Sequence, residues 1–144
     1  MPRLFGLNII ASLVAGLAFW MLGYLWYGNL FLDPWTAMQN FTPEQEAYGE
    51  ANMGMLMGLG FLIALISSGF IGFVLRKIGA TELVDTIKMS LVLCFGFVAL
   101  TQLYDVVYAL EPMHLFFIDA GYQVIGFPLM AAIHTLMANV MVKD

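Results

Sequence analysis

Two aspartates, Asp105 and Asp119, are the residues of this chain whose type and position could support chemistry. Each lies inside a long apolar stretch, and an ionised side chain at the centre of a bilayer costs roughly 2.5–3.5 kcal/mol. Such a carboxylate needs a hydrogen-bond donor, a cation or water. Two neighbouring carboxylates can also share one proton, because their charges repel each other. The pair therefore predicts a polar site for a cation, a proton or a small polar solute.

Helix geometry places the two aspartates at a similar depth. Asp105 lies about one turn before the end of its stretch, and Asp119 lies about 8 Å along its helix from His114. Polar and aromatic residues of the first, third and fourth stretches are expected at the same level. The expected binding residues are Asp119, Asp105, Tyr122, Tyr108, Gln123, Trp20, Tyr24, Trp26 and Tyr27.

Three roles remain open for Asp119. It could fix the start of its helix through hydrogen bonds, with the tyrosines forming an interfacial aromatic belt. It could line a cavity that binds a cation or solute. It could join Asp105 and His114 at a metal ion, but their spacing is not typical of a metal site, so no metal is expected. His134 lies about 22 Å further along the helix and is expected to be a hydrogen-bonded packing residue rather than a ligand.

Four apolar stretches must position these residues, at about 7–28, 51–75, 86–110 and 114–140. Each is long enough to cross a hydrocarbon core of ~30 Å as a helix. Only 10% of the residues are charged, against about a quarter in soluble domains. The sequence therefore predicts one all-α integral membrane domain over residues 1–144, with four transmembrane helices in an antiparallel up-down bundle.

The cations predict how this bundle crosses the membrane. Arg3, Arg76, Lys77, Lys88 and Lys143 all fall at the termini or between the second and third stretches. The other two linkers contain no Lys or Arg. Because cations favour the cytoplasmic side, both termini are expected in the cytoplasm and the protein in a bacterial inner membrane, in contact with lipid. The net charge of −5 and the lack of a basic patch argue against nucleic acid as a partner.

The linkers contain start and stop signals for helices. Asp33 followed by Pro34 predicts the start of a short interfacial helix that ends near Asn40. Thr42-Pro43-Glu44-Gln45 predicts a capping box and a helix that leads into the second span. Gly79 is expected to end the second span, and Thr81 to cap the third.

Small residues predict where helices approach one another closely, because association in lipid depends on packing. They fall on one face of the first span and one face of the second: Ser12, Gly16 and Gly23, then Gly54, Gly58, Gly69 and Gly72. These faces could pack within one chain or form a homo-oligomer interface. A homo-oligomer is the expected state, because a solute path would form more easily between protomers than inside four helices.

No sequence pattern indicates an enzyme. The chain has no nucleotide-binding loop, no histidine-rich box and no Ser-His-Asp or Cys-His arrangement in a familiar context. No cofactor is indicated. The leading hypothesis is an outer-side polar pocket that binds or passes a small solute or cation. The alternative is a structural or accessory subunit that docks to a larger membrane complex.

Two motifs resemble those of a known family. Gly23-Tyr24-Leu25-Trp26-Tyr27-Gly28, followed by Leu30-Phe31 and Trp35, resembles a first-helix signature, and Phe117-Ile118-Asp119-Ala120-Gly121-Tyr122 resembles a fourth-helix signature. Both are similar to domain of unknown function 1761, a family of small four-helix bacterial membrane proteins. The resemblance implies the fold and a membrane location, and no established activity.

The resemblance draws attention to how the two motifs meet. Both fall on the predicted outer side, so Trp26 and Tyr27 are expected to pack against the turn that contains Asp119 and Tyr122. Family members often carry a proline and then Gly-Lys in the first loop, where this chain has Asn29 and Leu32-Asp33. Any role that depends on that lysine is therefore not expected here.

Overall fold

The computed structural model describes residues 3–4 and 7–140, and almost all of this part is helical. A pair of two-residue strands precedes the first helix, with Arg3 opposite Asn8. The elements are β1 (Arg3–Leu4), β2 (Leu7–Asn8), α1 (Ile9–Leu25), the π-helical turn η1 (Trp26–Leu30), α2 (Leu32–Gln39), α3 (Pro43–Ala51), α4 (Met53–Lys77), α5 (Leu83–Leu93), the π-helical turn η2 (Cys94–Ala99), α6 (Leu100–Tyr108) and α7 (Met113–Val140).

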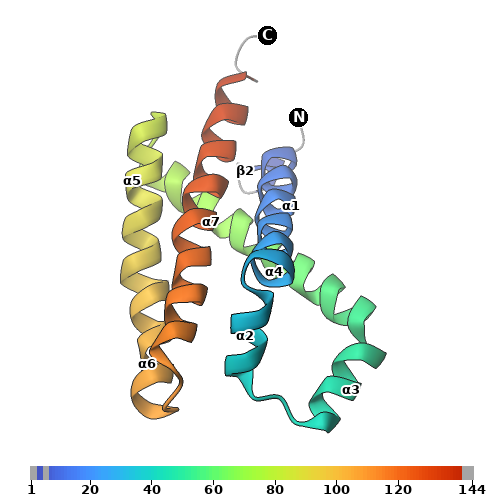
Figure 1. Cartoon of the computed structure of the whole chain (residues 1–144). Coiled ribbons are helices and arrows are strands. Elements are labelled where there is room, and N and C mark those ends of the chain that lie inside the picture. The colour runs from blue at the N-terminus through green and yellow to red at the C-terminus, as the bar shows by residue number, and fades with distance from the viewer. Residues whose placement is uncertain (1–2, 5–6, 141–144) are drawn as a thin grey trace.

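Four helical segments are long and apolar enough to cross a membrane. They are Ile9–Leu30, Met53–Lys77, Leu83–Tyr108 and Met113–Ala138, and the predicted spans agree with them to within three residues. The start of α1, the α4–α5 link and the end of α7 lie at one end of the molecule, called here the α4–α5 end (Figure 1). The short helices α2 and α3 and the α6–α7 turn lie at the opposite end, called the α6–α7 end. Lys143 lies outside the described residues.

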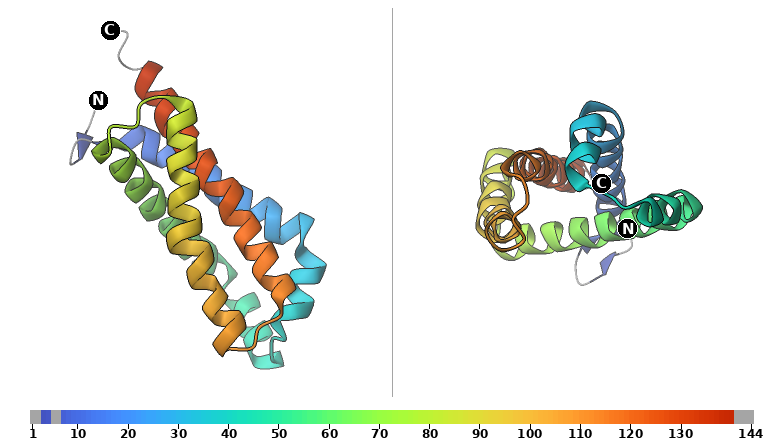
Figure 2. Two further views of the ribbon diagram at one scale, coloured as in Figure 1. Left: turned by 90° about the vertical axis from the view of Figure 1, so that its left-hand side faces the viewer. Right: turned by 60° about the horizontal axis from the view of Figure 1, so that its bottom comes forward.

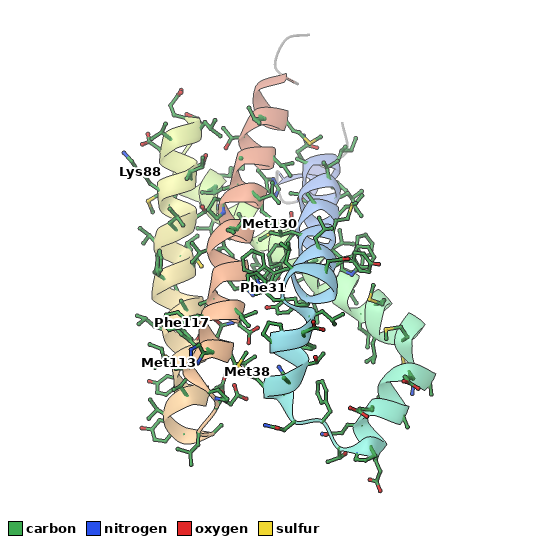
Figure 3. All side chains as sticks on the ribbon, in the orientation of Figure 1. Phe31, Met38, Lys88, Met113, Phe117 and Met130 are labelled. Carbon is green, nitrogen blue, oxygen red and sulfur yellow. The ribbon has the colours of Figure 1, made fainter. Side chains whose placement is uncertain are left out.

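The helices α1 and α7 occupy the centre of the fold. The helix α1 packs against both α4 and α7, and α7 also packs against α5, whereas α4 and α5 touch little although they are consecutive. The helix α4 runs obliquely behind the others, and α3 projects to one side (Figures 1 and 2). Met130 is fully buried between α7 and α1 (Figure 3). The core consists of Ala15, Phe19, Ala64, Ile71, Leu75, Met130 and Ala131.

Two of the predicted helix boundaries are confirmed in atomic detail. The Thr42 hydroxyl accepts from the Gln45 backbone N–H, and the Gln45 side chain accepts from the Thr42 N–H at 2.8 Å, which forms the capping box. Gly79 follows the last turn of α4 with φ of +71°, a conformation that favours glycine. The N–H groups of Gly79 and Ala80 bond to the carbonyls of Arg76 and Leu75, as in a Schellman motif.

Two predicted caps are wrong. The helix α2 begins at Leu32, one residue before Asp33, because the Trp35 N–H already bonds to the Phe31 carbonyl. Asp33 therefore lies in the first turn, where an acid interacts favourably with the helix dipole. Glu82 rather than Thr81 occupies the N-cap position of α5, because the Thr86 N–H bonds to the Glu82 carbonyl.

Only some of the small residues pack within the chain. A Cβ at Gly16 would lie 2.7 Å from Leu65 of α4, and one at Gly23 would lie 3.1 Å from the Tyr122 hydroxyl of α7. The Ser12 carbonyl also accepts a hydrogen bond from the Ser68 hydroxyl at 2.9 Å. These residues therefore hold α1 close to its two main neighbours, as predicted.

The glycine face of α4 divides into two parts. A Cβ at Gly72 would lie 2.7 Å from Nδ1 of His134, so this glycine allows α4 and α7 to approach. A Cβ at Gly54, Gly58 or Gly69 would have no neighbour within 4 Å in the described part of the chain. Packing within one chain is therefore wrong for these three glycines, and contact with a second chain stays a prediction.

We expect Gly72→Ala to lower the melting temperature of the protein in detergent, because the added Cβ overlaps a buried imidazole. Overpacking of this kind costs roughly 1–3 kcal/mol. Gly69→Ala is the matched control one turn away, and its melting temperature should be unchanged or slightly raised, because alanine favours a helix. Equal losses in both variants would contradict a close contact between α4 and α7.

Candidate polar site between α1 and α7

Three side-chain hydrogen bonds join the end of the first span to the first half of the fourth. The Tyr27 hydroxyl donates to Oδ1 of Asp119 at 2.9 Å. The Trp26 indole N–H donates to the Ile118 carbonyl at 3.0 Å, and the Tyr122 hydroxyl donates to the Phe19 carbonyl at 3.0 Å. We call this set the α1–α7 polar contact. It confirms the prediction that Trp26 and Tyr27 pack against the turn containing Asp119 and Tyr122.

The π-helical turn η1 explains how two consecutive residues reach the same partner helix. The Phe31 N–H bonds to the Trp26 carbonyl at 2.8 Å, five residues back. Such a turn holds more residues than an α-helical turn, so successive side chains diverge by a smaller angle. Trp26 and Tyr27 can therefore both face α7. The sequence does not predict this turn, because no capping or glycine signal marks its start.

Aromatic rings pack around the contact. The Tyr122 ring stacks on Phe19 with centroids 4.7 Å apart, and Tyr27 contacts both Tyr122 and Trp35 at 5.3 Å. Gly121 leaves room for the Trp26 indole, since a Cβ there would lie 3.1 Å from Cζ2. The contact is therefore surrounded mainly by aromatic side chains of α1, α2 and α7.

The Asp119 carboxylate has only neutral donors as partners. The Tyr27 hydroxyl donates to it, and the neutral Trp35 side chain of α2 packs against the Tyr27 ring beside it. No Lys or Arg lies between residues 89 and 142 or between residues 4 and 75. The charged group that interacts with Asp119 is another acid, Asp105. A partly buried carboxylate thus sits in a spanning helix without a counter-ion among the described residues.

Several predicted pocket residues lie elsewhere. Trp20 packs edge-on against Phe61 of α4, with centroids 5.8 Å apart. Tyr24 is 58% exposed and Tyr108 is 76% exposed, the latter stacked on Tyr104. Trp20, Tyr24 and Tyr108 therefore take no part in the α1–α7 polar contact, and their role as pocket walls stays a prediction. Helical periodicity predicted which residues share a face and could not predict which neighbour that face would meet.

The remaining predicted residues, Gln123, Asp105 and His114, make no hydrogen bond to Asp119 among the described residues. Gln123 follows Asp119 by one turn and is partly buried. Asp105 and His114 are exposed. Within the described residues, no three His, Cys, Asp or Glu side chains gather in a way that could hold a metal ion, so the weak candidate set of Asp105, His114 and Asp119 is not assembled.

A second polar cluster lies towards the α4–α5 end and confirms His134 as a hydrogen-bonded packing residue. Nε2 of His134 lies 2.9 Å from the Ser68 carbonyl oxygen and 3.1 Å from Ser68 Oγ. Because a carbonyl oxygen can only accept, Nε2 must carry the proton in this network. Nε2 therefore cannot take a proton from Ser68, which argues against a Ser–His nucleophile.

The same cluster extends to the third span. The Thr135 hydroxyl donates to Oγ1 of Thr86 at 2.9 Å, and both side chains are buried, as are Ser68 and Ser90. The sequence signal for this cluster is the presence of small hydroxyl side chains at inward positions of the apolar stretches. These bonds tie α7 to α4 and α5, so the cluster has a structural role.

A cavity of about 540 Å³ lies between the third span and α7. Its lining is apolar and comes from both helices, including Phe95, Gly96 and Ala99 of η2 and Phe117, Ala120 and Gly121 of α7. Phe117 points to the α6 side of α7 (Figure 3). This cavity is therefore not the polar pocket that the sequence predicted.

Four apolar spans, joined by side-chain hydrogen bonds such as Tyr27–Asp119 and Ser68–His134, define a polytopic α-helical membrane protein. The chain belongs to the family described as protein of unknown function DUF1761, whose model matches residues 10–135. The predicted family is thereby confirmed. No curated protein and no solved structure matches the chain.

We expect a double-mutant cycle on Tyr27→Phe and Asp119→Ala to give a coupling energy of about 0.6 kcal/mol, and up to about 1.7 kcal/mol, as for other hydrogen bonds between membrane helices. The measurement is the free energy of unfolding in mixed detergent micelles. Tyr24→Phe removes an exposed hydroxyl from the same helix and should leave stability unchanged. Additive effects of the two substitutions would contradict the bond.

Proposed function

We propose that the protein is a multi-pass bacterial inner-membrane protein with both termini in the cytoplasm and its spans in up-down order. The distribution of cations supports this orientation. Arg76, Lys77 and Lys88 belong to the α4–α5 end, whereas the linkers at the α6–α7 end, residues 29–50 and 111–113, contain no Lys or Arg. The α6–α7 end then faces outward.

Reporter fusions test the orientation. Alkaline phosphatase, which is active only outside the cytoplasm, should be active when fused after Asn40 and inactive when fused after Gly79. A fluorescent protein that folds only in the cytoplasm should give the reverse pattern at the same two positions. The opposite result with both reporters would place the α6–α7 end in the cytoplasm.

We further propose that the outer end binds a small cation at Asp119, without catalysis. The observation that supports this function most directly is the Asp119 carboxylate itself, which is partly buried and accepts from the neutral Tyr27 hydroxyl but has no counter-ion within residues 3–4 and 7–140. The acids of the same end, among them Glu44, Glu46 and Glu111, should raise the local concentration of cations. Aromatic rings beside the carboxylate, such as Trp35, suit an organic ammonium ion as well as a metal ion.

A second candidate is the accessory role. Gly54, Gly58 and Gly69 present open backbone on α4, and small residues of this kind permit close approach of another helix in lipid. The partner could be a second copy or a subunit of a larger membrane complex. This role uses α4 and leaves Asp119 free to act structurally.

Thermal stability in the presence of cations tests the first proposal. Na⁺, K⁺, Ca²⁺ and tetramethylammonium are added separately to purified protein at matched ionic strength. A cation at one hundred times its dissociation constant should stabilise the fold by about 2.7 kcal/mol. Asp119→Asn should abolish the shift in melting temperature, because the charge is lost while the shape of the side chain is kept.

Two further variants separate specific binding from other effects. Glu46→Gln removes an exposed acid from α3 and should keep the shift. Gly58→Leu should change the size of any assembly without changing the cation response, since a Cβ at this position has no neighbour within 4 Å. Equal shifts in the wild type and in Asp119→Asn would exclude Asp119 as the cation site.

A further inference from the structure

The helix α2 and the π-helical turn η1 form one aromatic unit at the α6–α7 end. The Phe31 ring lies 4.6 Å from the ring of Trp26, and the Trp35 ring lies 5.3 Å from that of Tyr27, between centroids. All four rings belong to residues 26–41, called here the 26–41 segment. Their contacts hold α2 against η1, so the two elements can move together.

This segment is attached to α7 at few points. Its two side-chain hydrogen bonds to α7 both start from η1, from the Trp26 indole to the Ile118 carbonyl and from the Tyr27 hydroxyl to Asp119. The helix α2 contacts α7 directly, and Met38 points from α2 towards it (Figure 3). No residue of α2 is buried. Parts of a protein with few buried contacts are the ones that open locally, without unfolding of the whole.

The backbone is irregular at both ends of α2. At its start, the Phe31 N–H bonds to the Trp26 carbonyl five residues back rather than four. At its end, Asn40 has a left-handed conformation with φ of +50°, and residues 40–42 are not helical before α3 begins. Hinges are usually a few residues at the ends of elements, where backbone angles can change. The helix α2 therefore has a suitable hinge position on each side.

The contacts of the segment connect α2 to the Asp119 carboxylate. The Tyr27 hydroxyl binds Oδ1 of Asp119, and Trp35 packs against the Tyr27 ring. Asp119 is partly buried, whereas Asp105 and Glu111 of the same end are exposed. Because Tyr27 and Trp35 belong to one aromatic unit, a movement of α2 away from α7 would draw Tyr27 away from the carboxylate.

We propose that the 26–41 segment is a lid over Asp119, closed in this structure, whose opening controls the access of a small cation to the carboxylate from the α6–α7 end. This inference rests on the proposed cation site at Asp119, and it adds the element that regulates entry to that site.

Carboxyl labelling of the full chain in detergent micelles tests the lid without any cation ligand. The protein is treated with a water-soluble carbodiimide and glycine ethyl ester, and peptide mass spectrometry follows the modification of each acid with time. The measured quantity is the labelling rate of Asp119 divided by that of Asp105, which is exposed. In the wild type Asp119 should react several-fold more slowly. Equal rates would show that Asp119 is already open and would overturn the proposal.

Variants of α2 test whether the lid causes the protection. Trp35→Ala removes the ring packed against Tyr27 and should raise the ratio of rates several-fold. Met38→Ala shortens the side chain that points towards α7 while it keeps the aromatic unit, and it should raise the ratio as well. Leu32→Ala is the matched control, because Leu32 is 42% exposed on the same helix, and its ratio should be unchanged. Unchanged ratios in Trp35→Ala and Met38→Ala, or an equal rise in Leu32→Ala, would overturn the lid.

The buried thiol of Cys94 separates lid opening from unfolding. Cys94 is fully buried in the third span, so N-ethylmaleimide should react with it only when the bundle opens as a whole. It should stay unreactive in Trp35→Ala and Met38→Ala. A rise of Cys94 labelling in parallel with that of Asp119 in both variants would overturn a local opening.

The lid and the cation site can fail separately. If the ratios change as expected but no cation shifts the melting temperature of the wild type, the lid covers Asp119 and the cation site is wrong. If cations shift the melting temperature through Asp119 but the ratios stay constant in the α2 variants, the site stands and the lid is wrong.

Discussion

The fold depends on the need to satisfy polar groups inside apolar helices. In hydrocarbon an unpaired donor or acceptor has no water to bond with, so a buried polar side chain needs a partner on its own helix or on another. The chain meets this need at two levels, through the α1–α7 polar contact at one end and the Ser68–His134 cluster at the other. The two levels together fix the position of α7 along α1 and α4.

This arrangement gives the four spans unequal roles. The helices α1 and α7 carry the polar contact and most of the core, and α4 and α5 are added to them on separate sides. Because α4 and α5 hardly touch, the surfaces of the second and third spans are left open to lipid or to other molecules. The glycine face of α4 and the apolar cavity between the third span and α7 both belong to these outer surfaces, so binding there need not disturb the centre.

Hydropathy and local signals predicted the spans, the capping box at Thr42 and the glycine stop at Gly79, because each depends on residues close in sequence. The meeting of Tyr27 with Asp119 was also predictable, since topology places both at one end. The directions in which the Trp20, Tyr24 and Tyr108 side chains point were not predictable from the sequence. They depend on how each helix is rotated against its neighbours, and the π-helical turns in the first and third spans shift the phase of the side chains without a sequence signal.

The α1–α7 polar contact joins residues 92 to 103 positions apart, and this separation has a consequence for biosynthesis. During translation α1 enters the membrane long before α7 leaves the ribosome. While the middle spans are inserted, α1 lacks the partners on α7 for Trp26, Tyr27 and the Phe19 carbonyl. The nascent first helix is thus held by lipid and by α4 alone. The stable centre of the protein can form only when nearly the whole chain has been made.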